Sequence, residues 1–331
     1  MLNDCVKMQT YNFLQIRRCT FATPLQTMKH LLLVALAITA CLSDCFAQQR
    51  TAQRLNDSSI LTSDSVQLYL KIAGKGIPCI FVHGGPGAWS FSFEAMGGNA
   101  LEKNLAMYYF DQRGCGRSGS PANKDYSVER MVNDIEEIRM LSGVDKVYVM
   151  GHSFGGILAH SYALRYPQHV KGLVLLNSTL SINNSLINQI QFINKLLGEN
   201  VMVTNRDSIM TPFMEAKSLL SKRHLDYKML SDNKAAVDRL DSIDNCMPRN
   251  YTFAQNALSS PVYFRDFTTE TQQVKMPVLV ISGTKDNNIG PDHYKLFRYP
   301  NQKVVKISGG HILYYEKNRE FVQAVTNWIN R

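Results

Sequence analysis

The sequence lacks the signatures of several common protein classes. Its 331 residues include seven cysteines and no Cys-x-x-Cys pair, which excludes a disulfide scaffold and a zinc or thiol redox site of that kind. No run of five or six basic residues occurs, so the formal net charge of +9 predicts a basic surface and no binding of nucleic acid. Only one long apolar run is present, which excludes a protein with several membrane spans.

Phosphate-binding loops are also missing. There is no Gly-x-x-x-x-Gly-Lys, and no Gly-x-Gly-x-x-Gly stands between a predicted strand and a predicted helix, so we expect no cofactor and no bound metal. The composition is that of a folded protein, with 45% hydrophobic, 10% aromatic and 19% charged residues. This balance excludes disorder and is sufficient for one large domain or two small ones.

The N-terminal apolar run has the form of a signal peptide. A short positive stretch, Lys29-His30, precedes an apolar run from Leu31 to Leu42, and the small residue Ala47 follows. Residues 1–47 are therefore predicted to be a targeting segment that is cleaved after Ala47, with export to the periplasm or the medium. Because the run is shorter than the roughly 20 residues of a spanning helix, we expect no stable transmembrane anchor.

Two alternatives remain for this segment. Ile38-Thr39-Ala40-Cys41 resembles a bacterial lipobox, and processing there would leave a lipoprotein anchored through Cys41. Residues 1–27 show no clear pattern, so Met28 is an alternative start of the chain.

Buried strands and helices alternate along the rest of the chain. A strand with period two is predicted at residues 66–72, and helical periodicity that begins at Val128 ends at Gly143. This alternation predicts an α/β fold, with a mostly parallel sheet and helices on both of its faces. Short continuous apolar runs, typical of strands buried on both faces, occur at residues 79–82, 105–110, 146–150, 172–176, 277–281 and 304–307.

The pattern changes between Asn177 and Phe267. Strand-like runs are absent there, and polar helical segments with Met and Leu replace them. Because strands resume afterwards, we interpret residues 178–267 as a helical cap inserted into one core, which consists of residues 48–177 and 268–331.

A Gly-x-Ser-x-Gly motif follows the predicted strand at residues 146–150. It reads Gly151-His152-Ser153-Phe154-Gly155 and leads into a helix that stops at Pro167. In this context the motif is typical of a sharp turn that holds a serine hydroxyl above the sheet edge, at a helix N-terminus. Ser153 is therefore the predicted nucleophile, and the alternative interpretation is a Gly/Ser turn without chemistry.

A serine nucleophile needs a histidine base and an acid that orients the histidine. Asp286 follows the predicted strand at residues 277–281, and His311 follows the last predicted strand. The chain order Ser, acid, His is that of hydrolases with this motif, and the carboxyl ends of parallel strands converge at one edge. We predict a triad of Ser153, Asp286 and His311, with Asp292 as the alternative acid.

The tetrahedral intermediate of such a reaction needs two N–H donors. The N–H of Phe154, next to the serine, is one candidate. The second is expected at Gly85, or alternatively at Gly84, where the missing Cβ lets the backbone approach a substrate. Trp89 and Phe91 lie just beyond this loop and are candidates for the pocket wall, with core packing as the alternative.

Three motifs together resemble the proline iminopeptidase (prolyl aminopeptidase) family of α/β-hydrolases. They are His83-Gly84-Gly85-Pro86-Gly87, the stretch from Asp111 to Ser118, and the stretch from Gly151 to Gly156. The resemblance covers most of residues 60–331 and implies an α/β-hydrolase fold with the same triad. It also implies that Asp111-Gln112-Arg113 supports the oxyanion loop, although we favour an internal salt bridge as the role of Arg113.

The cap departs from the family pattern. Family members hold the free amino group of the substrate with cap glutamates, one of them commonly after a Trp, whereas this cap contains no Trp. Four other acids of the cap are available for this purpose, namely Glu199, Glu215, Asp226 and Asp244.

The resemblance implies a metal-independent serine exopeptidase that acts on short peptides. We therefore predict a serine hydrolase, most specifically an aminopeptidase that releases N-terminal proline or another small residue. An esterase or small-amide hydrolase with the same triad is the alternative, and a non-catalytic binding protein of this fold is less favoured. The sequence makes no prediction of the oligomeric state.

Overall fold

The computed structural model describes residues 59–205, 208–257 and 259–330. All of them belong to one unit, which spans residues 54–331. The predicted targeting segment, with its two alternative processing sites at Ala47 and Cys41, lies outside the described residues. Among the helices that are described, none is long and apolar enough to cross a membrane.

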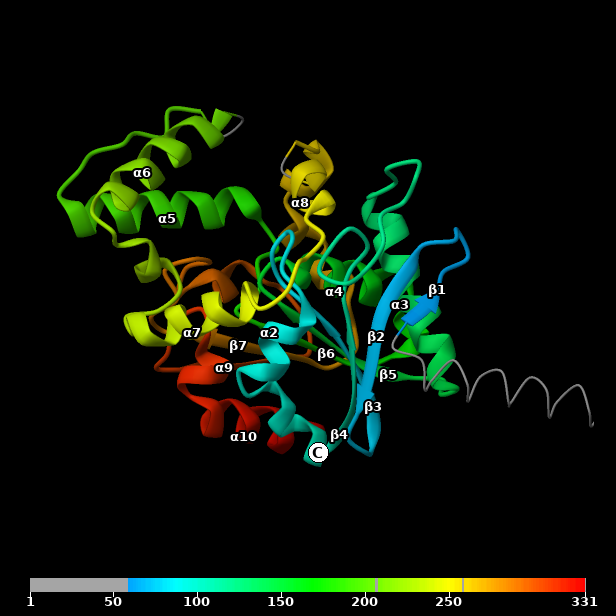
Figure 1. Cartoon of the computed structure of the whole chain (residues 1–331). Coiled ribbons are helices and arrows are strands. Elements are labelled where there is room, and N and C mark those ends of the chain that lie inside the picture. Colours follow the sequence, from blue (N-terminus) through cyan, green and yellow to red (C-terminus); the bar gives the residue numbers. More distant parts are fainter. Residues whose placement is uncertain (1–58, 206–207, 258, 331) are drawn as a thin grey trace, which may run out of the picture. The chain divides into compact units, whose positions relative to one another are not determined.

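One sheet of eight strands organises the described part of the chain, in the order β1-β2-β4-β3-β5-β6-β7-β8 (Figure 1). β2 pairs antiparallel with β1 and β4, and every pair between β4 and β8 is parallel. The carboxyl ends of the parallel strands therefore meet at one edge, where open α/β sheets bind ligands. The strands are β1 (Ser59–Leu61), β2 (Gln67–Ala73), β3 (Ile77–Val82), β4 (Leu105–Phe110), β5 (Val147–His152), β6 (Val170–Leu176), β7 (Val278–Gly283) and β8 (Gln302–Ile307).

The strands lie where the apolar runs predict them. β5 and β7 are buried along their whole length, and β3, β4 and β6 along most of theirs, because helices cover both faces of a parallel sheet. β2 buries Leu68 and Leu70 and leaves Gln67 and Lys71 exposed, as its period of two predicts. β1 was not predicted, since three residues are too few to establish a period.

Helices pack on both faces of this sheet. On one face, α3 (Val128–Ser142) and α4 (Gly155–Arg165) contribute to a large core cluster. On the other, α2 (Ser90–Ala95) and α10 (Asn318–Ile329) contribute to a second cluster. The shorter helices of the core are η1 (Gly98–Lys103), η2 (Pro167–His169), η7 (His293–Leu296) and α9 (Leu313–Glu316).

Between β6 and β7 the described residues form helices and no strand. α5 (Ile182–Leu197) and α6 (Met210–Lys222) lie side by side (Figure 1) around an apolar cluster of their own. A backbone bridge between Asn250 and Gly116 ties this segment, which we call the cap, to the sheet-bearing core. Its other helices are η4 (Asp226–Met229), α7 (Lys234–Asp244), α8 (Thr252–Ala257) and η5 (Pro261–Phe264), and η6 (Phe267–Gln273) leads from the end of the cap to β7.

Candidate active site

Ser153 occupies the turn between β5 and α4 that the motif predicts. Its φ is +54°, a left-handed conformation that is uncommon for residues other than glycine. The flanking glycines are required by close packing. A Cβ on Gly155 would lie 2.2 Å from the carbonyl oxygen of Val82, and a Cβ on Gly151 would lie 2.7 Å from that of Gly155. The turn thus holds the Ser153 side chain, 8% exposed, beyond the carboxyl end of β5.

Asp286 and His311 meet in a hydrogen bond, although they follow different strands. Nδ1 of His311 lies 3.0 Å from Oδ2 of Asp286, and Oδ1 of the same carboxylate accepts hydrogen bonds from the N–H groups of Asn288 and Ile289. Burial alone would raise the pKa of the Asp286 carboxyl, but the charge and hydrogen bond of His311 and the N–H of Ile289 together lower it. The ionised carboxylate accepts a hydrogen bond from the Nδ1–H group of His311, which leaves Nε2 as the basic nitrogen.

Ser153 and His311 line the same pocket, which has a volume of about 240 Å³. Its walls also contain the glycine loop after β3 and several apolar side chains from both the core and the cap. Trp89, one of the predicted wall residues, lines it, whereas Phe91 does not. The lining residues are Phe81, His83, Gly84, Gly85, Ala88, Trp89, Ser92, Phe93, His152, Ser153, Leu230, Leu240, Asp244, Asn288, His311, Ile312 and Tyr314.

The glycine loop passes directly over the serine. A Cβ on Gly84 would lie 2.9 Å from Cβ of Ser153, so only glycine fits there without a shift. Gly85 has φ +122°, and a Cβ on it would lie 2.5 Å from the nitrogen of Gly87. Phe154, the other predicted donor, follows Ser153 with its side chain 2% exposed.

One motif residue, Gln112, braces this loop from the segment that follows β4. The N–H of Gln112 donates to Nε2 of His83 at 2.9 Å, and Nε2 of Gln112 donates to the carbonyl oxygen of His83 at 2.7 Å. Arg113 plays a different part, because its buried guanidinium pairs with Asp134 at 2.7 Å and Asp64 at 2.8 Å. Its ion pairs therefore agree with the internal salt bridge that we favoured from the sequence.

The pocket contains one of the cap acids. Asp244, at the end of α7, accepts hydrogen bonds at Oδ1 from Nε1 of Trp89 (2.8 Å) and from the hydroxyl of Ser92. Glu199 and Glu215, the candidates named first from the sequence, are both exposed and do not line this pocket. The local sequence does not distinguish Asp244 from Glu199 and Glu215. Asp244 reaches the pocket because the end of α7 returns to the core.

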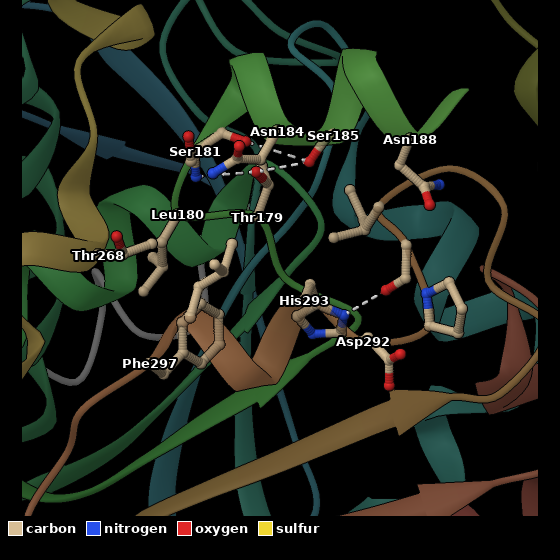
Figure 2. A pocket seen from close by; sticks show the side chains of 14 residues that line it. Thr179, Leu180, Ser181, Asn184, Ser185, Asn188, Thr268, Asp292, His293 and Phe297 are labelled. Atoms are coloured by element: carbon tan, nitrogen blue, oxygen red, sulfur yellow. Dashed lines mark hydrogen bonds between the residues drawn. The ribbon is translucent and has the colours of Figure 1, made fainter. Parts of the chain in front are cut away.

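A separate pocket of about 270 Å³ lies between the start of α5 and the loop after β7 (Figure 2). His293 lies there with its Nδ1 2.7 Å from the carbonyl oxygen of Gly290. Asp292, the alternative acid, lines this second pocket and pairs with Lys295 at 2.9 Å. The hydrogen bond to His311 is made by Asp286 and not by Asp292. Among the described residues, no group of three or more His, Cys, Asp or Glu could hold a metal ion.

Comparison with known proteins supports the α/β-hydrolase fold. The family model for the alpha/beta hydrolase fold matches residues 77–200. The chain is similar to the proline iminopeptidase of Lactobacillus delbrueckii subsp. bulgaricus, with 26% identity over 287 residues that cover 80% of this chain and 94% of the relative. It is similar to the proline iminopeptidase of Clostridium botulinum, with 23% identity over 279 residues, 78% of this chain and 91% of the relative.

Solved structures share the fold. A proline iminopeptidase-related protein from Thermus thermophilus superimposes with a TM-score of 0.67 and 20% identity, over 81% of this chain and 95% of the other. An esterase from Exiguobacterium antarcticum gives a TM-score of 0.62 and 17% identity, over 83% of this chain and 99% of the other. At these identities the superpositions establish the α/β-hydrolase fold and leave the reaction open.

Proposed function

Because the chain belongs to the proline iminopeptidase-like α/β-hydrolases, we propose that it is a serine aminopeptidase that releases proline, or another small N-terminal residue, from short peptides. One observation carries the proposal. A single pocket is lined by Ser153, by His311 with Asp286 behind it, and by the carboxylate of Asp244. Ser153 is the nucleophile and His311 its base, and the carboxylate of Asp244 is an anion that can bind a free amino group.

In the proposed mechanism, Ser153 Oγ attacks the carbonyl carbon of the first residue while Nε2 of His311 takes its proton. The N–H groups of Phe154 and of Gly85, or alternatively Gly84, donate to the oxyanion that forms. His311 returns the proton to the leaving amine, and an acyl-enzyme remains on Ser153. A water molecule then attacks the ester with His311 again as base, which releases the amino acid and restores the serine.

Asp244 is the proposed anchor of the substrate amine. Trp89 and Ser92 fix its Oδ1, and no hydrogen bond in the described part of the chain uses its Oδ2. A fixed carboxylate with a free oxygen can accept a charge-assisted hydrogen bond from an ammonium group. The apolar side chains of Phe93, Leu240 and Tyr314 line the same pocket and would contact a pyrrolidine ring or a small side chain.

The rest of the peptide has a route out of this pocket. A neighbouring pocket between α6, η4 and α7 shares Leu230 and Asn288 with the pocket of Ser153. We propose that residues after the cleaved bond extend in this direction, which fits an exopeptidase for short peptides.

A second candidate function is the hydrolysis of esters or small amides. Nη1 of Arg249 lies 3.5 Å from Oδ1 of Asp244 and reduces the negative charge that an ammonium group would meet. This contact favours substrates without a charged amine, so the two functions differ in their dependence on that group.

A substrate panel with the purified protein tests both functions. The panel compares prolyl-naphthylamide, its N-acetyl derivative and a butyryl ester, and the variants are Ser153→Ala and the control Ser161→Ala. Ser161 is buried on α4 and its hydroxyl has no hydrogen-bond partner among the described residues, so its loss should leave turnover unchanged. We expect Ser153→Ala to lower kcat by a factor on the order of 10⁴–10⁶.

The pattern across the panel separates the candidates. Rapid turnover of prolyl-naphthylamide with little turnover of the acetylated compound supports the aminopeptidase. Preference for the ester, regardless of a free amine, supports the second candidate. Full activity of Ser153→Ala would reject the serine mechanism for both.

We also propose that the protein is exported. The signal-peptide pattern before Ala47 supports this location. N-terminal sequencing of the mature protein tests it: a start at Gln48 fits a cleaved signal peptide, a modified Cys41 fits a lipoprotein, and retention of residues 1–27 would contradict both.

A further inference from the structure

Asn177 is hydrogen-bonded to the nucleophile turn, to the last residue of β7, which leads into the acid loop, and to the histidine loop. Its backbone carbonyl oxygen accepts the N–H of Ser153 at 3.1 Å. Its side-chain Oδ1 accepts the N–H of Gly283 at 2.7 Å, in the strand that leads to Asp286. Its Nδ2 donates to the carbonyl oxygens of Gly310 (2.9 Å) and His311 (3.0 Å). One residue thus joins the nucleophile turn, the end of β7 and the histidine loop.

The position of Asn177 in the sheet makes these contacts possible. It follows β6 directly, and β6 lies between β5, which ends at the serine turn, and β7, which leads to the acid. The residue is fully buried and has φ +41°, a left-handed conformation in which asparagine is enriched. Its backbone N–H donates to Ile281 at 2.9 Å, so its side-chain and main-chain polar atoms all have partners.

Few other side chains could replace this amide. The acid and histidine loops pass close together here, since a Cβ on Gly283 would lie 2.6 Å from the carbonyl oxygen of Gly309 and 2.7 Å from that of Gly310. A side chain between these two loops must offer one acceptor toward Gly283 and two N–H donors toward the histidine loop. A primary amide supplies all three groups. Aspartate would place a second acceptor against two carbonyl oxygens, and alanine would remove all three side-chain bonds.

We propose that Asn177 is the positioning residue of the site, which sets the place of His311 and Asp286 relative to Ser153. The inference rests on the proposed triad. Asn177 does not line the pocket, so it acts through the loops and not on the substrate. The histidine loop has further supports in the carbonyl oxygen of Leu230 and the carboxylate of Glu316. Loss of the amide should therefore displace the loop without unfolding it.

The test compares Asn177→Ala and Asn177→Asp with a matched control, Asn194→Asp. Asn194 also uses both amide atoms, toward Val201 within the cap, so its side-chain hydrogen bonds join two parts of the cap and not the triad loops. We expect both Asn177 variants to lower kcat by about 10²-fold, the effect of a small misplacement of reacting groups, with little change in KM. The control should keep the kcat of the wild type.

Two further measurements separate positioning from general stability. The rate at which a fluorophosphonate labels Ser153 should fall with kcat, because it depends on the base. The low-field proton signal of the His311–Asp286 hydrogen bond in NMR spectra should shift in the Asn177 variants and not in Asn194→Asp. A merely structural role would lower the melting temperature and leave both readouts unchanged in the folded fraction.

The outcomes distinguish this inference from the proposed function. Failure of the wild type to react with the fluorophosphonate would reject the serine mechanism itself. If the wild type is labelled, and the folded Asn177 variants have the same labelling rate and the same kcat as the wild type, only the role of Asn177 is rejected. Loss of folding in both Asn177 variants would also reject it, because positioning predicts a folded protein with impaired chemistry.

Discussion

Nδ1 of His311 and Oδ2 of Asp286 lie 3.0 Å apart, although 25 positions separate the two residues in the chain. The carboxylate is fully buried and its other oxygen is satisfied by two backbone N–H groups. The acid therefore has a fixed orientation, and so does the imidazole that it contacts.

Asp286→Asn should lower kcat by about 10⁴, because an amide can stabilise neither the required tautomer nor the imidazolium that forms during attack. The matched control is Asp292→Asn, which lies at the second pocket and pairs with Lys295. Steady-state kinetics on the best substrate of the panel measures both. If Asp292→Asn instead produced the larger loss, the assignment of the acid would be wrong.

Asp244→Asn should raise KM for prolyl-naphthylamide by about 10- to 100-fold, the effect of losing one charge-assisted hydrogen bond. The amide keeps the contacts with Trp89 and Ser92 but carries no charge for the substrate amine. Glu129→Gln is the control, since Glu129 lies on α3 and pairs with Arg165 at the surface. An equal effect on the butyryl ester would show that Asp244 acts through pocket shape and not by binding an amine.

Gly85→Ala should lower kcat by about 10²–10³, because its Cβ would displace a loop that is proposed to donate to the oxyanion. Gly198→Ala provides the control for backbone strain. Gly198 also has a positive φ, +71°, but no atom of the described residues lies within 4 Å of the added Cβ. Gly198→Ala should therefore cost about 1 kcal/mol of stability with no loss of kcat. Kinetics and urea unfolding of both variants give the comparison, and unaffected turnover in Gly85→Ala would contradict the role of the loop.

The protein should lose stability as the pH falls from 6.5 to 5. Burial lowers the pKa of His152 to about 3 and that of His160 to about 4, and it also lowers the pKa of His83 and His293. In the unfolded chain each histidine binds a proton below about pH 6.5, so unfolding takes up protons and acid favours it. Each of these buried histidines lowers the free energy of unfolding by up to about 1.4 kcal/mol for each pH unit below about 6.5.

Urea unfolding at several pH values measures this slope. His160→Gln should reduce the slope by the equivalent of about one proton, because it removes a buried imidazole with a lowered pKa. His160 contacts Tyr299 and does not line the pocket of Ser153. His224→Asn, a change at an exposed residue, should leave the slope unchanged. A free energy of unfolding that is constant between pH 6.5 and 5 would contradict the burial of these imidazoles.

Local sequence determined much of the sheet. Continuous apolar runs marked β3 to β7, because a strand covered by helices on both faces has no exposed side to carry polar residues. β8 is the edge strand of the sheet, where Lys306 is exposed and most of the other residues are half-buried. The Gly-x-Ser-x-Gly turn could be located for a similar reason, since the glycines flanking Ser153 are fixed by contacts with the adjacent strand and helix. The same logic placed Asp286 and His311 at strand ends, where the topology of a parallel sheet brings loops together.

The parts that local sequence did not specify depend on contacts between distant segments. Asp244 reaches the pocket, whereas Glu199 and Glu215 remain exposed, because the path of α7 across the core decides which cap acid meets Trp89. Asn177 looks like an ordinary residue after a strand, and its role arises only where β5, β6, β7 and the loop after β8 converge. Periodicity reports which side of an element is buried, but a hydrogen bond between loops requires the three-dimensional path of each loop. The sequence by itself thus determined the elements and the chemical groups available at their ends, and the tertiary structure decided which of these groups meet.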